Sequence, residues 1–169
     1  MVDEIINRVA NSKLITFDLE DYYPSNPRTI IDIKVWLFHE LILKEVDFRA
    51  SLKNHDWTQY QNHFVALTCT ADAIIPSWAY LLITTYLTQF SKKIVVGTLN
   101  DLENAVFFDI INNLDTSSFI DKPIIIKGCS NKPIPETAYV HLVEKLKPVA
   151  SSIMFGEACS SVPLYKKSN

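Results

Sequence analysis

Hydrophobic and polar residues alternate along this chain with two different periods, one typical of strands and the other of helices. Short apolar runs predict strands at residues 13–18, 29–33, 64–68, 93–96, 124–127 and 149–155. Apolar residues at helical spacing predict helices at residues 76–90, 99–114 and 135–147. A broken helical pattern from residue 34 to residue 61 predicts two short helices followed by a loop around residues 54–57.

Strands that alternate with helices in this way are typical of an α/β fold with a parallel sheet. We therefore expect one α/β domain across residues 1–169. Its βαβ core would cover residues 63–169 and hold about four strands of a mostly parallel sheet, joined by right-handed crossovers. Residues 1–62 would add strands and helices as a cap or at an edge of the sheet. No internal repeat is expected.

Composition and charge exclude some classes of partner. The net charge is −3 with few clustered basic residues, so no surface for nucleic acid is expected. Residues 1–11 lack the apolar core of a signal peptide, which predicts a cytoplasmic protein. The most apolar stretch, residues 73–86, is shorter than the roughly 20 residues that cross a bilayer, so no membrane span is expected.

The three cysteines of the chain carry the leading hypothesis about chemistry. Cys69, Cys129 and Cys159 each come just after an apolar run that predicts a buried strand. In open parallel sheets, ligands bind beyond the carboxyl ends of the strands, so one sheet would bring the three sulfurs together. An odd number of cysteines in a cytoplasmic protein favours reduced thiols over a disulfide framework. The sequence therefore predicts a thiolate metal site.

Thiolates prefer transition metals, so the predicted metal is zinc, with iron or an iron–sulfur cluster as the alternative. Three sulfur ligands leave a fourth position, for which Asp72, Glu157 and His55 are the candidates. His55 could instead orient a ligand or face a substrate. The acidic turn at residues 18–21 is interpreted as a solvated connection rather than as a metal site.

Three other interpretations of these residues stay open. The cysteines could be small buried residues at crowded turns. The protein could also be a metal-free thiol enzyme in which the N-terminus of a helix activates Cys69 or Cys129 as a nucleophile. The last interpretation is a noncatalytic protein whose exposed aromatic residues, in the first third of the chain, bind a partner or a second copy as a homodimer.

Several sequence blocks resemble a known family over nearly the whole chain. They are residues 7–12, 19–24, 53–57, 66–80, 126–129 and 152–165. The chain is similar in these blocks to the uncharacterised bacterial domain-of-unknown-function 2480 family. The resemblance implies no activity. Members of this family are often encoded near genes for iron–sulfur cluster assembly, so the resemblance implies iron–sulfur assembly proteins as partners.

Overall fold

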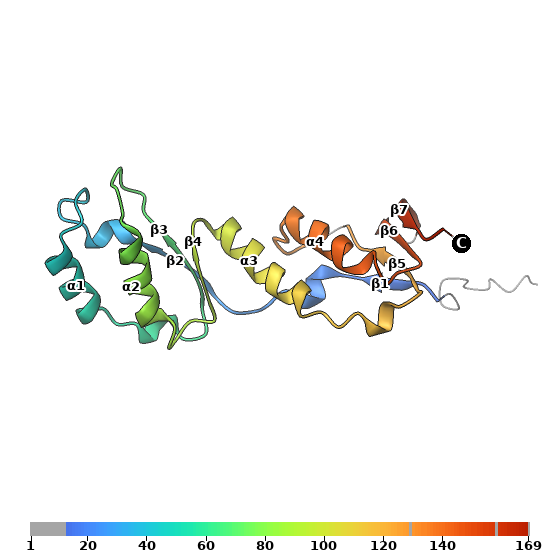
Figure 1. Ribbon diagram of the computed structural model, residues 1–169, viewed down its shortest axis with the longest axis horizontal. Coiled ribbons are helices and arrows are strands. Elements are labelled where there is room, and N and C mark those ends of the chain that lie inside the picture. The colour runs from blue at the N-terminus through green and yellow to red at the C-terminus, as the bar shows by residue number, and fades with distance from the viewer. Residues whose placement is uncertain (1–12, 129, 158, 169) are drawn as a thin grey trace, which may run out of the picture. The chain divides into compact units, whose positions relative to one another are not determined.

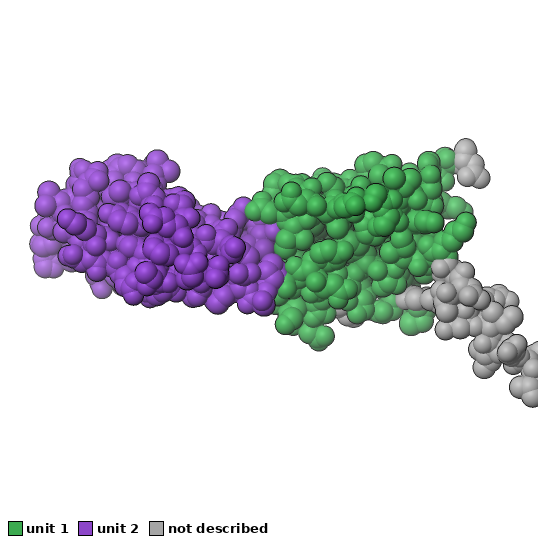
Figure 2. All heavy atoms as spheres, turned by 90° about the horizontal axis from the view of Figure 1, so that it is seen from below, with its two compact units in different colours: residues 1–23, 107–169 green, residues 24–106 purple. Residues whose placement is uncertain are grey.

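The computed structural model describes residues 13–128, 130–157 and 159–168 as two compact units. Unit 1 comprises residues 1–23 and 107–169, apart from those positions outside the description, and unit 2 comprises residues 24–106 (Figure 2). The strands are β1 (Ile15–Phe17), β2 (Arg28–Asp32), β3 (Phe64–Thr68), β4 (Lys93–Val96), β5 (Pro123–Ile126), β6 (Ser152–Glu157) and β7 (Ser160–Lys166). The α-helices are α1 (Glu45–Asn54), α2 (Ser77–Leu87), α3 (Leu99–Asn112) and α4 (Glu136–Leu146). Four short 3₁₀ helices are η1 (Leu19–Tyr22), η2 (Ile33–Trp36), η3 (Thr58–Tyr60) and η4 (Ser117–Phe119).

Unit 2 is built on a parallel sheet, called sheet B, with the strand order β2-β3-β4 (Figure 1). Its central strand β3 is apolar along its length because both of its edges and both of its faces are covered. Helices α1 and α2 pack on one face, where Phe48 and Ile83 contribute fully buried side chains. The same core contains Val65 and Leu67 of β3.

Unit 1 is built on a second sheet, called sheet A, with the order β1-β5-β6-β7. The first three strands are parallel, and β7 pairs antiparallel with β6 across a tight turn. The core of this unit holds Ile124 and Ile126 of β5, together with Phe107 of α3 and Leu142 of α4. None of the helices that the structure describes in either unit combines the length and apolar character needed to cross a membrane.

The predicted α/β class with a mostly parallel sheet of four strands is confirmed. The membership of that sheet differs from the expectation, because β3 and β4 belong to sheet B whereas β5 and β6 belong to sheet A. The N-terminal third supplies an edge strand to each sheet, β1 to sheet A and β2 to sheet B. Of the two short helices expected between residues 34 and 61, α1 is confirmed, whereas residues 33–36 form a 3₁₀ turn.

The two units repeat one another, which corrects the expectation that the chain has no internal repeat. Elements of unit 2 recur 59 positions later in unit 1, as α2 does in α4 (136 minus 77) and η3 in η4 (117 minus 58). The strand register recurs as well, since Phe64 pairs with Lys93 and Pro123 pairs with Ser152. Each unit is thus a βαβ unit with the same spacing, preceded by the same short helix.

Turns and core positions follow the same 59-residue spacing. Asp56 and Asp115 each accept a hydrogen bond from the backbone N–H two residues later. Asn62 and Asp121 both have left-handed backbones, with φ of 63° and 53°. The buried faces of the crossover helices also coincide, as the following residues show: Ala79, Ile83 and Leu87 in α2, and Ala138, Leu142 and Leu146 in α4. The repeat therefore extends from the strand register to single hydrogen bonds.

Candidate functional site

The structure places the predicted metal ligands in separate parts of the fold. Cys69 follows β3 in unit 2, where it is half-buried and its Sγ lies 3.8 Å from the carbonyl oxygen of Ala71. Asp72 lies in the exposed part of the same loop. Glu157 ends β6 in unit 1, and Cys159 is exposed in the turn before β7. Cys129 lies outside the described residues.

The hypothesis of a thiolate metal site is wrong. No group of three or more His, Cys, Asp or Glu side chains within residues 13–128, 130–157 and 159–168 is arranged to hold a metal ion. The physical reason lies in the topology. The prediction assumed a single sheet, but β3, which precedes Cys69, and β6, which precedes Cys159, belong to different sheets. Their carboxyl ends therefore do not form one shared edge.

The repeat also shows that Cys69 and Cys129 are not equivalent positions, as the metal-site hypothesis required. We expected Cys69 and Cys129 to occupy matching positions after their strands. In the common register of the two sheets, the residue that corresponds to Cys69 is Gly128. The two cysteines are thus one position out of register.

His55, the third candidate for the fourth ligand, belongs to an aromatic cluster in unit 2. Its Nε2 lies 2.9 Å from the hydroxyl oxygen of Tyr60, and its ring stacks on that of Tyr60 at a centroid distance of 5.7 Å. Trp36 and Trp57 approach the same imidazole edge-on, with centroids at 5.3 and 4.7 Å. Burial disfavours the charged imidazolium and lowers the pKa of His55, although the carboxylate of Asp56 partly opposes this. His55 is therefore a packing residue.

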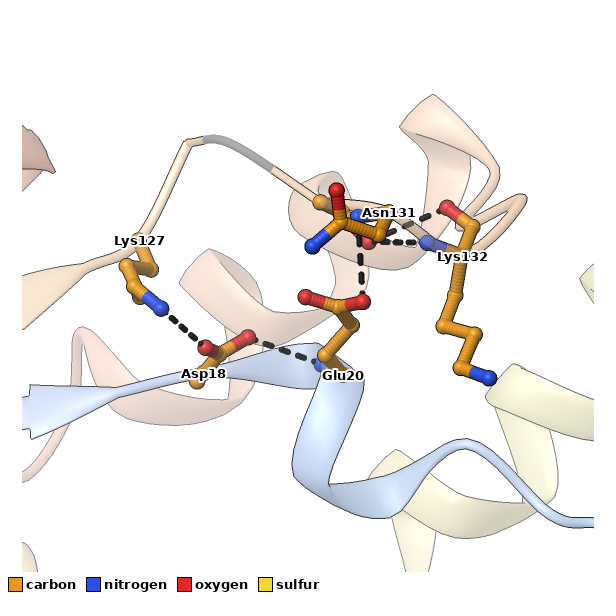
Figure 3. A network of polar contacts seen from close by, with 6 residues as sticks. Asp18, Glu20, Lys127, Asn131 and Lys132 are labelled. Atoms are coloured by element: carbon orange, nitrogen blue, oxygen red, sulfur yellow. Dashed lines mark hydrogen bonds and ion pairs between the residues drawn. The ribbon is translucent and has the colours of Figure 1, made fainter.

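The carboxyl edge of sheet A carries a polar network built by the acidic turn and the loop after β5 (Figure 3). The carboxylate of Asp18 accepts hydrogen bonds from Lys127 Nζ at 2.7 Å and from the backbone N–H of Glu20 at 2.9 Å. Glu20 in turn accepts a hydrogen bond from the backbone N–H of Asn131 at 3.0 Å. Partial burial alone would raise the pKa of Asp18, but Lys127 and the Glu20 N–H lower it below its ordinary value. The network holds the two turns together.

The carboxyl edge of sheet B has the corresponding arrangement. Asp32 is the last residue of β2, as Asp18 is the first residue after β1, and it accepts a hydrogen bond from the backbone N–H of Lys34 at 3.0 Å. It also binds the loop after β3, through the hydroxyl group of Thr70 at 2.5 Å and the N–H of Thr70 at 3.1 Å. In both units, one aspartate ties the neighbouring turn in place, and all of its polar partners are internal. These turns are therefore structural.

Beside this edge, unit 2 has an exposed groove lined by both apolar and polar groups, which we call the unit 2 groove. Residues 41–43 and 72–74 form two of its sides, and Glu45, Pro76 and Trp78 complete the lining around a volume of about 520 Å³. Ile74 is 95% exposed, and Leu41 and Ile42 are each 57% exposed. Folding thus leaves these large aliphatic side chains in water, although burying each one would contribute roughly 1.5–3 kcal/mol.

The segment that carries Leu41 and Ile42 differs from the helix that its apolar spacing predicts. His39 and Glu40 have left-handed backbones, with φ of 50° and 58°. Such residues interrupt a helix. The segment instead folds back on itself, because the backbone of Phe38 pairs with that of Ile42. The apolar spacing alone therefore did not reveal the groove.

The fold defines a mixed α/β protein of two repeated units, and the second of these carries the unit 2 groove. Residues 3–167 match the family described as "Protein of unknown function (DUF2480)", and the chain belongs to this family. This confirms the resemblance seen in the sequence. No curated protein and no solved structure matches the chain significantly.

Proposed function

We propose that this protein is a noncatalytic docking protein that binds an apolar segment of a partner protein in the unit 2 groove. The observation that carries the proposal is the 95% exposure of Ile74, which lines the groove together with the exposed Leu41 and Ile42. Exposed apolar patches on soluble proteins mark interaction sites when several such side chains lie together. The proposal relies on aliphatic side chains rather than on the aromatic residues of the first third, of which Trp57 and Tyr60 are buried and Phe38 is 41% exposed.

The lining indicates what kind of segment fits. The hydrophobic positions call for aliphatic or aromatic side chains, which would fill the groove and exclude water. Glu45 is paired with Arg49 at 2.8 Å. Asp72 contributes the other carboxylate of the lining, and no hydrogen bond or ion pair within the described part of the chain engages its side chain. The partner segment is therefore apolar and carries a basic residue that meets Asp72.

The test compares wild-type protein with Ile74→Asp and with Ile120→Asp as the matched control. Both isoleucines are exposed, at 95% and 54%, but Ile120 lies in unit 1, and neither substitution removes a buried side chain. Each protein is immobilised and used to capture proteins from an extract of the source cells. A captured protein is then purified and titrated against all three by calorimetry.

We expect wild type and I120D to bind the same purified partner, and I74D to bind it at least tenfold more weakly. Asp72→Asn should weaken binding less and should reduce its dependence on salt, because it removes one exposed charge pair. Equal affinities of wild type and I74D for every captured protein would exclude the unit 2 groove as the docking site. Unchanged circular dichroism spectra would show that the variants are folded.

A further inference from the structure

The outer edge of β4 is open in sheet B, whereas the matching edge in unit 1 is occupied. Strand β4 pairs with β3 on one side and ends the order β2-β3-β4 of the described strands. Its counterpart β6 has the same register toward its own neighbour, but β7 adds to its other side in antiparallel orientation. The repeat thus indicates what kind of element fits beside β4, namely an antiparallel strand.

The orientation of the backbone N–H and C=O groups of β4 supports the pairing of another strand at its outer edge. The N–H of Gly97 donates to the carbonyl oxygen of Leu67 in β3 at 2.9 Å. Successive residues of a strand bond to opposite neighbours, so the N–H and C=O of Val96 point to the open edge. Unpaired backbone groups along a sheet edge are a template for another strand.

The side chain of Val96 at this edge is exposed in the way that a missing strand would cause. In unit 1, Leu164 of β7 lines an apolar groove together with Val143 of α4 and Phe155 of β6. The residue of unit 2 that corresponds to Phe155 is Val96, which is 56% exposed. Phe155, which lies beside β7, is less exposed than Val96. Val96 is thus a large apolar side chain that an added strand would cover.

We propose that β4 of a second copy of this chain fills the edge, so that two sheets B join through antiparallel β4 strands about a twofold axis. Charge favours this occupant. Lys92 directly precedes β4, and Asp101 lies in the first turn of α3, where its carboxylate also accepts hydrogen bonds from Thr98. An antiparallel pair places the basic end of each strand against the acidic end of the other, and a twofold axis forms this contact twice.

The expected dimer is weak and reversible. Strand β4 contains four residues, so the contact lies below the size of standard stable interfaces, about 1,200 Å². The dimer is independent of the unit 2 groove. Ile74→Asp should therefore leave self-association unchanged, and failure of either proposal would not imply failure of the other.

The test measures the molar mass of the full chain by sedimentation over a hundredfold range of concentration. Wild type should shift from monomer to dimer, and Val96→Lys should stay monomeric because it places a charge at the edge. Lys92→Glu provides a second variant outside the strand and should weaken the dimer at least tenfold, because it turns the contact with Asp101 of the other copy into a repulsion. Ile30→Lys is the matched control, since Ile30 is 49% exposed on β2 of the same sheet, and this variant should dimerise normally.

Amide hydrogen exchange gives an independent measurement, because exchange at Val96 should slow as the concentration rises. A monomer at all concentrations would overturn the proposal. A dimer that both V96K and K92E leave intact would overturn it as well, as would pairing of β4 with a different protein while this chain stays monomeric.

Discussion

The stability of unit 2 should depend on pH through one histidine, His55 of the aromatic cluster. Burial lowers the pKa of His55 below its ordinary 6.5, so the unfolded chain takes up a proton at a higher pH than the folded chain does. The stability that His55 contributes is therefore complete above pH 6.5 and decreases as the pH falls toward the lower folded pKa. We expect the urea midpoint of unit 2 to fall between pH 7.5 and pH 5.5.

His55→Gln should flatten this dependence, because glutamine does not titrate in this range and can still reach the hydroxyl group of Tyr60. His39→Asn is the control, since His39 is exposed and asparagine tolerates its left-handed backbone. Its pH dependence should match that of wild type. Retention of the full dependence in H55Q would show that another group is responsible.

Two glycines at equivalent positions of the repeat should differ in how much stability the protein loses when each is replaced. Gly97 and Gly156 follow the same register and have φ of 140° and 121°, where side chains other than glycine are strained. A Cβ at Gly156 would lie 2.6 Å from the carbonyl oxygen of Ser160, which is backbone of the paired strand. At Gly97 it would meet the carboxylate of Asp101, which is at the end of a side chain that can move.

We therefore expect Gly156→Ala to destabilise unit 1 by about 3 kcal/mol and Gly97→Ala to destabilise unit 2 by about 1–2 kcal/mol. The free energy of unfolding of each variant in urea measures the difference. Equal costs would mean that backbone strain alone decides, and that the neighbouring atoms do not matter.

At the scale of elements, one aspartate at the end of each first strand fixes the turn that follows the neighbouring strand. Asp32 accepts hydrogen bonds from Lys34 and Thr70, so Asp32→Ala leaves these donors without their acceptor. We expect a loss of about 1–2 kcal/mol in the stability of unit 2. Asp18→Ala is the matched variant in unit 1, and fluorescence of the tryptophans, which all lie in unit 2, should respond to D32A alone.

Much of this element structure could be predicted from the sequence, because it depends on local periodicity. The run at residues 64–68 is β3, and proline in the first turn marked the starts of α2 and α4. The division into two sheets could not be predicted, since it depends on which strands pair over long distances. The repeat was hidden because few matched positions are identical, such as Tyr80 and Tyr139, while others keep only their apolar character, as Leu67 and Ile126 do.

The same limitation explains the error over the cysteines. A cysteine after a buried strand identifies the end of the strand at which it lies, but it does not identify the sheet. Cys69 was assigned correctly to the carboxyl end of β3, and the assumption of one sheet then placed Cys159 beside it. The unit 2 groove was missed for a related reason, since Leu41 and Ile74 come from segments that only the folded chain brings together.

At the scale of the whole molecule, each unit has a hydrophobic core of its own. The buried cluster around Leu67 contains residues of unit 2, and the cluster around Ile126 contains residues of unit 1. These two residues are equivalent in the repeat and are both fully buried. Because all three tryptophans lie in unit 2, their fluorescence reports on that core, whereas circular dichroism reports on both units.

Because each unit has its own core, truncating a core side chain in one unit should destabilise that unit alone. Leu67→Ala and Ile126→Ala should each cost about 2–5 kcal/mol, because each removes buried methyl groups and leaves a cavity. L67A should lower the urea midpoint measured by tryptophan fluorescence. I126A should leave that midpoint in place and should produce an earlier transition in circular dichroism alone. A shift of both signals together by either variant would instead mean that the two units unfold as one cooperative structure.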